Sequence, residues 1–197
     1  MKEPYNDLAG IRQALHQLSP LKENEWADFS ERLISKHFHK GDFLIREGQV
    51  ENYIYFLTKG GTRNYFIKDG KDFTVDFQFE GDFVTAYYSL ITRTGSPVFI
   101  EALEETTAYA ISIKFLNELY VKHHHVERIG RLIAEQQYVK RLRKEMDLLS
   151  QTAEERYAAL LQRNPTLIQE LSVRHLSSYL GIQPESLSRI RKLHTRN

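Results

Sequence analysis

Side chains that could read a nucleic acid are concentrated between residues 172 and 192, in the segment SVRHLSSYLGIQPESLSRIRK. If residues 184–192 form a helix, Glu185, Arg189 and Lys192 lie on its outer face at spacings of four and three, with Ser186 and Ser188 beside them. An arginine on such a helix can pair bidentately with guanine in a major groove, and a glutamate can accept a hydrogen bond from cytosine. We therefore predict that this face reads base edges. Nearby basic and hydroxyl side chains suit phosphates, and the expected phosphate contacts are Ser172, Arg174, Ser188, Arg191 and Lys192.

Two short helices joined by a tight turn would position these side chains. Leu176 and Leu180 are four residues apart and share one face of the first helix, for which Ser172 is a suitable N-cap. Gly181 suits the turn because glycine adopts the left-handed backbone without a steric penalty, and Pro184 suits the first turn of the second helix. A helical hairpin that only packs would have the same spacing, so spacing alone leaves both interpretations open.

The run LSSYLGIQPESLSRIRK resembles the helix-turn-helix of the CRP/FNR family of bacterial transcription regulators. The resemblance implies sequence-specific binding to double-stranded DNA, and Glu185, Ser186 and Arg189 match the reading positions of the family. Pro184 departs from the archetypal member, which has a contacting arginine there, so we expect a partly different target sequence. Only five residues follow Lys192, so we also expect the chain to lack most of the β-hairpin wing of many family members.

Composition and charge narrow the class of protein. The 197-residue chain has no cysteine, which excludes disulfides, thiolate zinc sites and cysteine-bound iron–sulfur clusters. It has no apolar run near the roughly 20 residues that span a bilayer, and no signal-peptide pattern, so we expect a cytoplasmic protein without a membrane partner. Residues 1–120 hold 13 Lys/Arg against 18 Asp/Glu, net −5, whereas residues 121–197 hold 14 against 8, net +6. This asymmetry favours a sensor joined to a nucleic-acid-binding module.

Residues 37–113 have the pattern of short β-strands. Runs rich in Phe, Tyr, Ile, Val and Thr alternate with turn residues, and seven of the ten glycines lie between residues 41 and 95. Asp69-Gly70 is a strong hairpin signal. Several short strands with such turns predict a β-sandwich or barrel-like roll. Before this region, Leu8, Ile11 and Leu15 recur at helical spacing and predict packing helices in the first forty residues.

The segments KGDFLIREGQVENYIYFLTKG and EGDF resemble the cyclic-nucleotide-binding β-roll of the same family. Together with the C-terminal segment, the resemblance implies an α+β chain whose N-terminal part is a double-stranded β-helix, also described as a cupin-like jelly roll. The expected domains are a sensor roll with N-terminal helices at residues 1–122, a dimerisation helix at 123–150, and an all-α helix-turn-helix domain at 151–197.

The expected effector site departs from the family. In nucleotide-binding members a Gly-Glu pair after the GDF turn binds the ribose, and an Arg followed by Ser or Thr binds the cyclic phosphate. Those positions here hold Thr85-Ala86 and Ser96-Pro97, which offer no cation for a buried phosphate. We therefore do not expect cAMP as effector. A roll filled by its own aromatic side chains and a roll binding another small molecule both stay open, and the candidate pocket residues are Thr85, Ala86, Tyr87, Tyr88, Arg93, Ser96 and Pro97.

Residues 127–150 contain no proline and predict a long helix with an apolar seam. The seam residues repeat at intervals of seven in two series offset by three, as in coiled coils; they are Leu132, Val139, Leu142, Met146 and Leu149. An amphipathic helix lying on its own roll is the alternative, and the phase of Val126, Ile129 and Ile133 fits that role. In the family this helix forms the dimer interface, so the resemblance favours a parallel homodimer on an approximately palindromic operator.

No catalytic or metal-binding arrangement is readable in the sequence. His123, His124 and His125 are consecutive and point in different directions on a helix, while His37 and His39 supply only two ligands. We therefore expect no enzyme, no metal and no cofactor. The prediction is a homodimeric CRP/FNR-type transcription regulator of unknown effector, with RNA polymerase as a further candidate partner. The alternative is a small-molecule-binding roll whose helical tail mediates protein association.

Overall fold

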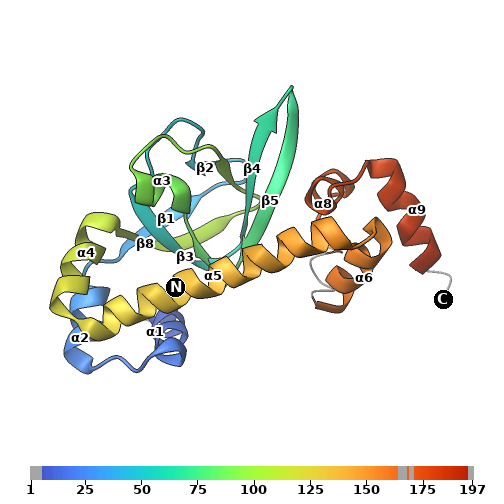
Figure 1. Cartoon of the computed structure of the whole chain (residues 1–197). Helices are drawn as coiled ribbons and strands as arrows, with labels where there is room; N and C mark the ends of the chain where they lie inside the picture. Colours follow the sequence, from blue (N-terminus) through green and yellow to red (C-terminus); the bar gives the residue numbers. More distant parts are fainter. Residues whose placement is uncertain (1–5, 164–167, 169–170, 195–197) are drawn as a thin grey trace. The chain divides into compact units, whose positions relative to one another are not determined.

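The computed structural model describes residues 6–163, 168 and 171–194, which form two compact units (Figure 1). The first unit contains residues up to Phe66 together with Asp76–Glu135. The second contains Ile67–Val75 together with the chain from Gln136 onward. The α+β composition expected from the sequence is confirmed, with strands in the first part of the chain and helices in the last.

Eight antiparallel strands in the described part of the chain form two four-stranded sheets, in the orders β1-β8-β3-β6 and β2-β7-β4-β5. Non-consecutive neighbours in both sheets are typical of a roll and not of a simple meander. The strands are β1 (Ile34–Phe38), β2 (Phe43–Ile45), β3 (Tyr53–Lys59), β4 (Gly61–Lys68), β5 (Lys71–Phe79), β6 (Phe83–Val84), β7 (Phe99–Ala102) and β8 (Thr106–Ser112).

The helices of the first unit precede and follow the strands in the sequence, except α3, which lies between β6 and β7. They are α1 (Asn6–Leu18), α2 (Glu23–Ser30), α3 (Tyr87–Thr92), α4 (Ile113–Lys122) and the start of α5 (His124–Ser150). Ser112 caps α4, since its Oγ accepts a hydrogen bond from the N–H of Phe115 at 3.3 Å. The predicted hairpin at Asp69-Gly70 joins β4 to β5, and both residues have positive φ.

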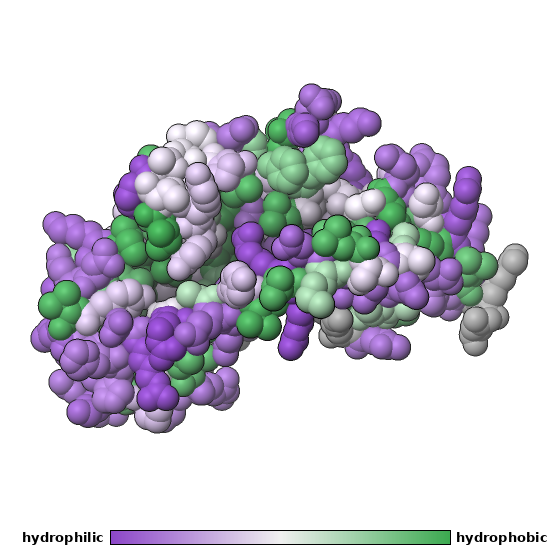
Figure 2. All heavy atoms as spheres, viewed as in Figure 1, coloured by the Kyte–Doolittle hydropathy of each residue, from purple (hydrophilic) through white to green (hydrophobic). Residues whose placement is uncertain are grey.

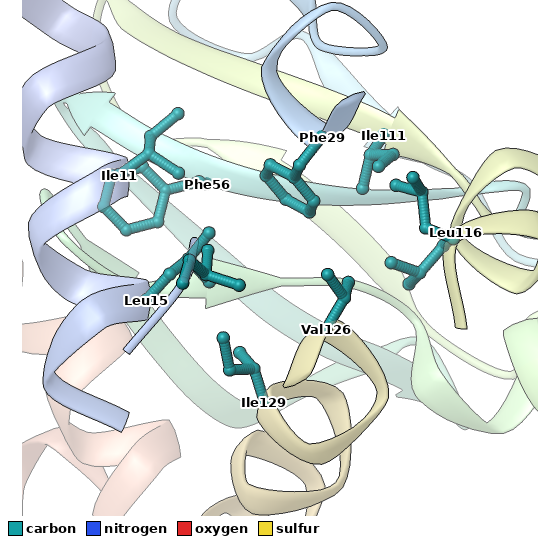
Figure 3. Close-up of a cluster of buried hydrophobic side chains, with 10 residues drawn as sticks. Ile11, Leu15, Phe29, Phe56, Ile111, Leu116, Val126 and Ile129 are labelled. Carbon is teal, nitrogen blue, oxygen red and sulfur yellow. The ribbon is translucent and has the colours of Figure 1, made fainter. Parts of the chain in front are cut away.

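A buried apolar cluster holds α1, α2, α4 and α5 against the sheet that contains β3 and β8 (Figure 3). Ile11 and Leu15 come from α1, as their helical spacing predicts, and Phe56 comes from β3. Val126 and Ile129 bring the first two turns of α5 into the same cluster. The early phase of this helix therefore packs on the chain's own roll, as the sequence suggests.

Histidine–carboxylate pairs fix α2 to the junction between α4 and α5. His123 Nε2 lies 2.7 Å from Asp28 Oδ2, and His125 Nδ1 lies 2.8 Å from Glu25 Oε1. Hydrogen bonds from Lys122 and His123 lower the pKa of Asp28. Burial alone would raise the pKa of Glu25, but hydrogen bonds from His125 and the N–H of Lys22 lower it below its ordinary value. These histidines therefore have structural roles.

The turn between β3 and β4 supplies a test of the roll's packing. A Cβ built on Gly60, where φ is +82°, would lie 2.6 Å from the carbonyl oxygen of Glu105, whereas one built on Gly41, where φ is +87°, meets nothing within 4 Å. We expect Gly41→Ala to cost about 1 kcal/mol for the left-handed backbone. Gly60→Ala should cost about 1–3 kcal/mol more because backbone must move. Urea unfolding measures both, and equal losses would contradict the steric account.

Candidate nucleic-acid interface

Two helices joined by a tight turn follow α6 (Ala153–Arg163) in the second unit: α8 (Val173–Leu180) and α9 (Pro184–His194). The Oγ of Ser172 accepts a hydrogen bond from the N–H of His175 at 3.1 Å and caps α8. Gly181 ends α8 with φ of +69°, and its N–H bonds back to the carbonyl oxygens of Ser177 and Ser178. The local geometry matches the sequence prediction for this segment, including Pro184 as the first residue of α9.

Apolar burial decides which face of α9 is presented. Leu176 and Leu180 of α8 and Leu187 and Ile190 of α9 are all buried. Burying these side chains contributes on the order of 1.5–3 kcal/mol each. The opposite face of α9 is exposed and is polar apart from Leu193.

The three predicted base-reading residues lie on that polar side of α9. Glu185 and Arg189 are exposed, and Ser186 is half-buried. Ser188 and Lys192 are also exposed, and the Ser188 hydroxyl donates to the Pro184 carbonyl at 3.1 Å. The geometry therefore brings a carboxylate, hydroxyls and two cations together on one helix surface.

Two arginines predicted to contact phosphates have partners within the second unit. Arg191 is half-buried, and its Nη2 donates to the Ile168 carbonyl at 3.0 Å, so it also anchors α9. Arg174 Nη2 lies 3.1 Å from Asp72 Oδ1. Asp72 belongs to residues 67–75, which we call the hairpin tip. The guanidinium of Arg174 is mostly exposed, so a phosphate could compete with Asp72 for it.

The hairpin tip bonds to α8 through Ser178 as well. The Ser178 hydroxyl donates to the Asp72 carbonyl at 2.9 Å and accepts from the Thr74 N–H at 2.8 Å. Nζ of Lys144 in α5 donates to the Val75 carbonyl and lies over the ring of Tyr179, 3.6 Å from its centroid. The sequence analysis missed these contacts because each of them joins separate elements, and the hydrogen bonds join residues 69 to 106 positions apart.

Arg156 is a second residue that the sequence analysis missed. Its Nε and Nη2 donate to the Leu180 carbonyl at 3.2 and 2.9 Å, which satisfies a carbonyl at the C-terminal end of α8. The sequence around Arg156 has no pattern that would predict this role, because its partner lies 24 residues further along the chain. It fixes α6 to the turn that precedes α9.

Much of the apolar seam of α5 is exposed and is not covered by the residues that the structure describes. Val139 is 45% exposed and Leu149 is 82% exposed; Leu142 and Met146 are exposed too. Leu132, nearer the roll, is half-buried. Figure 2 shows apolar side chains on the surface formed by α5. Exposed apolar side chains repeating along one helix mark an interaction surface.

The candidate effector residues are divided between the interior and the surface of the first unit. Ala86 and Ser96 are buried and Thr85 is half-buried, whereas Pro97 is exposed. The Ser96 hydroxyl is used within the chain, because it donates to the Val98 carbonyl at 2.8 Å. None of these four side chains carries a charge, and the expectation that cAMP is not the effector stays a prediction.

Two further pocket candidates lie at the surface of the first unit. Tyr87 and Tyr88 are 50% and 62% exposed, so their rings do not fill the interior of the roll. They occupy the first turn of α3, whose buried side is taken by Ser89 and Leu90. Arg93 adopts a left-handed conformation, with φ of +59°, and its guanidinium donates to the Glu51 carbonyl at 2.7 Å and to Asn52 Oδ1 at 2.6 Å. Its donors are therefore directed to the chain itself.

Metal-ligating side chains are not clustered in the described part of the chain. The described residues contain no group of three or more His, Asp or Glu side chains that could hold a metal ion. His39, one of the paired histidines of β1 and its following turn, lies 3.2 Å from Glu105 instead. Among the described helices, none combines the length and the apolar composition needed to cross a bilayer.

Comparison with known proteins gives a family match for the roll. Residues 35–123 match the model of the cyclic nucleotide-binding domain. A curated relative, the regulatory protein YeiL of Escherichia coli O157:H7, is 29% identical over 84 residues, which are 42% of this chain and 38% of YeiL. The match therefore spans well under half of that relative.

Solved structures extend the similarity to most of the chain. The c-di-GMP responsive global regulator CLP of Xanthomonas campestris aligns with a TM-score of 0.69 at 16% identity, covering 89% of this chain and 93% of CLP. A protein of Eubacterium rectale described as a transcriptional regulator of the CRP/FNR family aligns with a TM-score of 0.70 at 18% identity, covering 89% and 85%. Residues 35–123 are thus similar to the cyclic nucleotide-binding domain, and the fold of most of the chain is similar to that of these two regulators.

Proposed function

We propose that this protein is a homodimeric transcription regulator that binds double-stranded DNA through α9. The observation that carries the proposal is the surface of α9, where Glu185 and Arg189 are exposed while Leu187 and Ile190 are buried. A helix held in this way can enter a major groove with its polar face toward the base edges. The net charge of +6 over residues 121–197 would attract the phosphate backbone.

The exposed seam of α5 supports a dimer. Val139, Leu142, Met146 and Leu149 would be covered if two copies of α5 packed side by side, because their spacing suits a coiled-coil interface. A twofold dimer places two copies of α9 about 34–36 Å apart, or one DNA turn, so the expected target is approximately palindromic. The regulators with the same fold, and the regulatory protein YeiL, support this class of function.

The seam also supports the second candidate function, in which the roll binds a small molecule and the helical tail only mediates protein association. The two functions differ in their response to salt. Neutralising phosphates releases counterions, so true DNA binding weakens steeply as salt rises. Measuring affinity for duplexes selected from a random pool at two salt concentrations separates them, since a flat and unselective response would favour the second candidate.

Arg189→Ala tests base reading directly. We expect a loss of about 1–3 kcal/mol in binding free energy on the best duplex and relaxed selectivity at one base position, because a bidentate pair to a base would be removed. Electrophoretic mobility shifts on duplexes varied one position at a time measure both effects. Arg143→Ala, which removes the same charge from an exposed site on α5, is the matched control. Equal losses on every sequence would make Arg189 a phosphate contact.

Asp72→Asn tests whether Asp72 competes with a DNA phosphate for the guanidinium of Arg174. A surface ion pair contributes about 0–1 kcal/mol, so freeing the guanidinium should tighten DNA binding by up to about fivefold at low salt. Asp69→Asn removes the same charge from the turn of the same hairpin, three residues from the Asp72 that pairs with Arg174, and should have a smaller effect. Fluorescence anisotropy on one duplex compares them. An identical gain in both variants would assign the effect to net charge alone.

Leu142→Asp tests the dimer. A carboxylate placed in the covered seam would be desolvated without a partner, so the equilibrium should shift to monomer and DNA affinity should fall with it. Gln137→Asp puts the same charge on an exposed position outside the seam and should stay dimeric. Multi-angle light scattering over a range of concentrations reads the mass. A wild-type protein that stays monomeric at all concentrations would contradict the proposal.

A further inference from the structure

The carboxylate of Glu51 is buried at the start of β3, with 2% of the residue exposed. Its Oε1 accepts hydrogen bonds from the N–H groups of Asn52 and Tyr53, both at 3.0 Å. Its Oε2 accepts from the N–H of Ala86 at 3.4 Å, across 35 residues of chain. Three backbone donors from two separate segments therefore converge on one anion.

This cluster of donors has the chemistry of an anion site. Consecutive N–H groups that point the same way form a concavity that binds anions. Here the N–H of Ala86 adds a third donor from another segment. Arg93 adds positive potential, since its guanidinium bonds to the Glu51 carbonyl and to Asn52 Oδ1. A buried anion needs such donors to offset the loss of its hydration.

The segments that supply the donors are also tied together around the carboxylate. The N–H of Glu51 donates to the Ser89 hydroxyl at 2.9 Å, and that hydroxyl bonds in turn to the Thr94 carbonyl. The N–H of Ser96 donates to the Gln49 carbonyl at 2.7 Å. Residues 48–53 and 85–96 are thus held as one structure, which includes the Ala86 and Ser96 positions expected from the sequence to face an effector.

We propose that these donors form an anion-binding site of the roll and that its occupant is the chain's own Glu51 carboxylate. The Glu51 side chain takes the place that a small carboxylate would otherwise take, so the three N–H groups are satisfied without an external anion. The site is one for a monovalent carboxylate of the size of formate or acetate, which becomes accessible when the Glu51 side chain is removed. The inference concerns the roll alone and holds whether or not the protein binds DNA.

The acid–base behaviour of the cluster fits a buried carboxylate. Burial raises the pKa of Glu51, and the hydrogen bonds from Tyr53, Ala86 and Asn52 and the charge of Arg93 only partly offset that rise. The other ionisable groups around it are Tyr53 and Tyr55 of β3, and burial together with the Glu51 charge raises the pKa of Tyr55. Because the folded-state pKa of Glu51 is raised, its contribution to stability is greatest below the ordinary value of 4.5 and declines as pH rises through the folded-state value.

Glu51→Ala tests the proposal by emptying the site. Leaving the N–H donors without an acceptor should lower the melting temperature by about 3–10 °C. Sodium formate should then raise that temperature along a saturable curve, relative to sodium chloride at the same ionic strength, because a ligand that binds only the folded state stabilises it. Equal shifts with the two salts would overturn the proposal.

Two variants serve as controls. Glu51→Gln keeps the space filled, so formate should not stabilise it more than chloride does. Glu47→Ala removes an exposed carboxylate from the preceding turn and should behave as the wild type. Selective stabilisation of all variants by formate would point to surface binding and overturn the assignment.

A second measurement needs no cavity variant. In the wild type, the amide resonances of Asn52, Tyr53 and Ala86 should titrate together with one midpoint above 4.5, because all three N–H groups bond to the same carboxylate. In Glu51→Gln this shared titration should vanish. Three amides that stay unmoved between pH 4 and 8 in the wild type, or that move independently, would show that the carboxylate does not hold them.

Discussion

The burial of Leu176 and Leu180 against Leu187 and Ile190 is the constraint on which the proposed interface depends. These apolar side chains fix α9 against α8, and the helical period then leaves Glu185 and Arg189 on the outside. The packing of the two helices is therefore enough to expose the polar side chains of α9 to a binding partner. The Gly181 turn and the Arg156 contact to the Leu180 carbonyl serve this same packing.

The apolar side chains of the long helix α5 are buried near its start and exposed further along. Val126 and Ile129 are buried in the cluster that also holds α1 and α4, whereas Val139 and Leu149 are exposed. Its apolar residues follow one phase where it lies on the roll and another further on. A buried packing surface and an exposed apolar surface are thus encoded in one helix without a break.

Residues 35–123 are similar to the cyclic nucleotide-binding domain, and the roll holds a buried carboxylate in its interior. The N–H of Ala86 is directed to Glu51, and the guanidinium of Arg93 is directed to the Glu51 carbonyl and to Asn52. No side-chain substitution removes a backbone donor, so a buried one needs an acceptor within the roll. A buried glutamate on the neighbouring segment is a simple solution.

The sequence by itself determined the features that depend on neighbouring residues. The Asp69-Gly70 hairpin, the Ser172 cap, the Gly181 turn and the buried face of α1 all follow from local backbone preference or helical period. Only the tertiary structure decided the polar pairings, such as Arg174 with Asp72, Arg191 with the Ile168 carbonyl, and Glu51 with the Ala86 N–H. It also placed Tyr87 and Tyr88 on the surface. These outcomes depend on how distant segments dock, and a side chain's partner across such a contact leaves no periodic signal in the sequence.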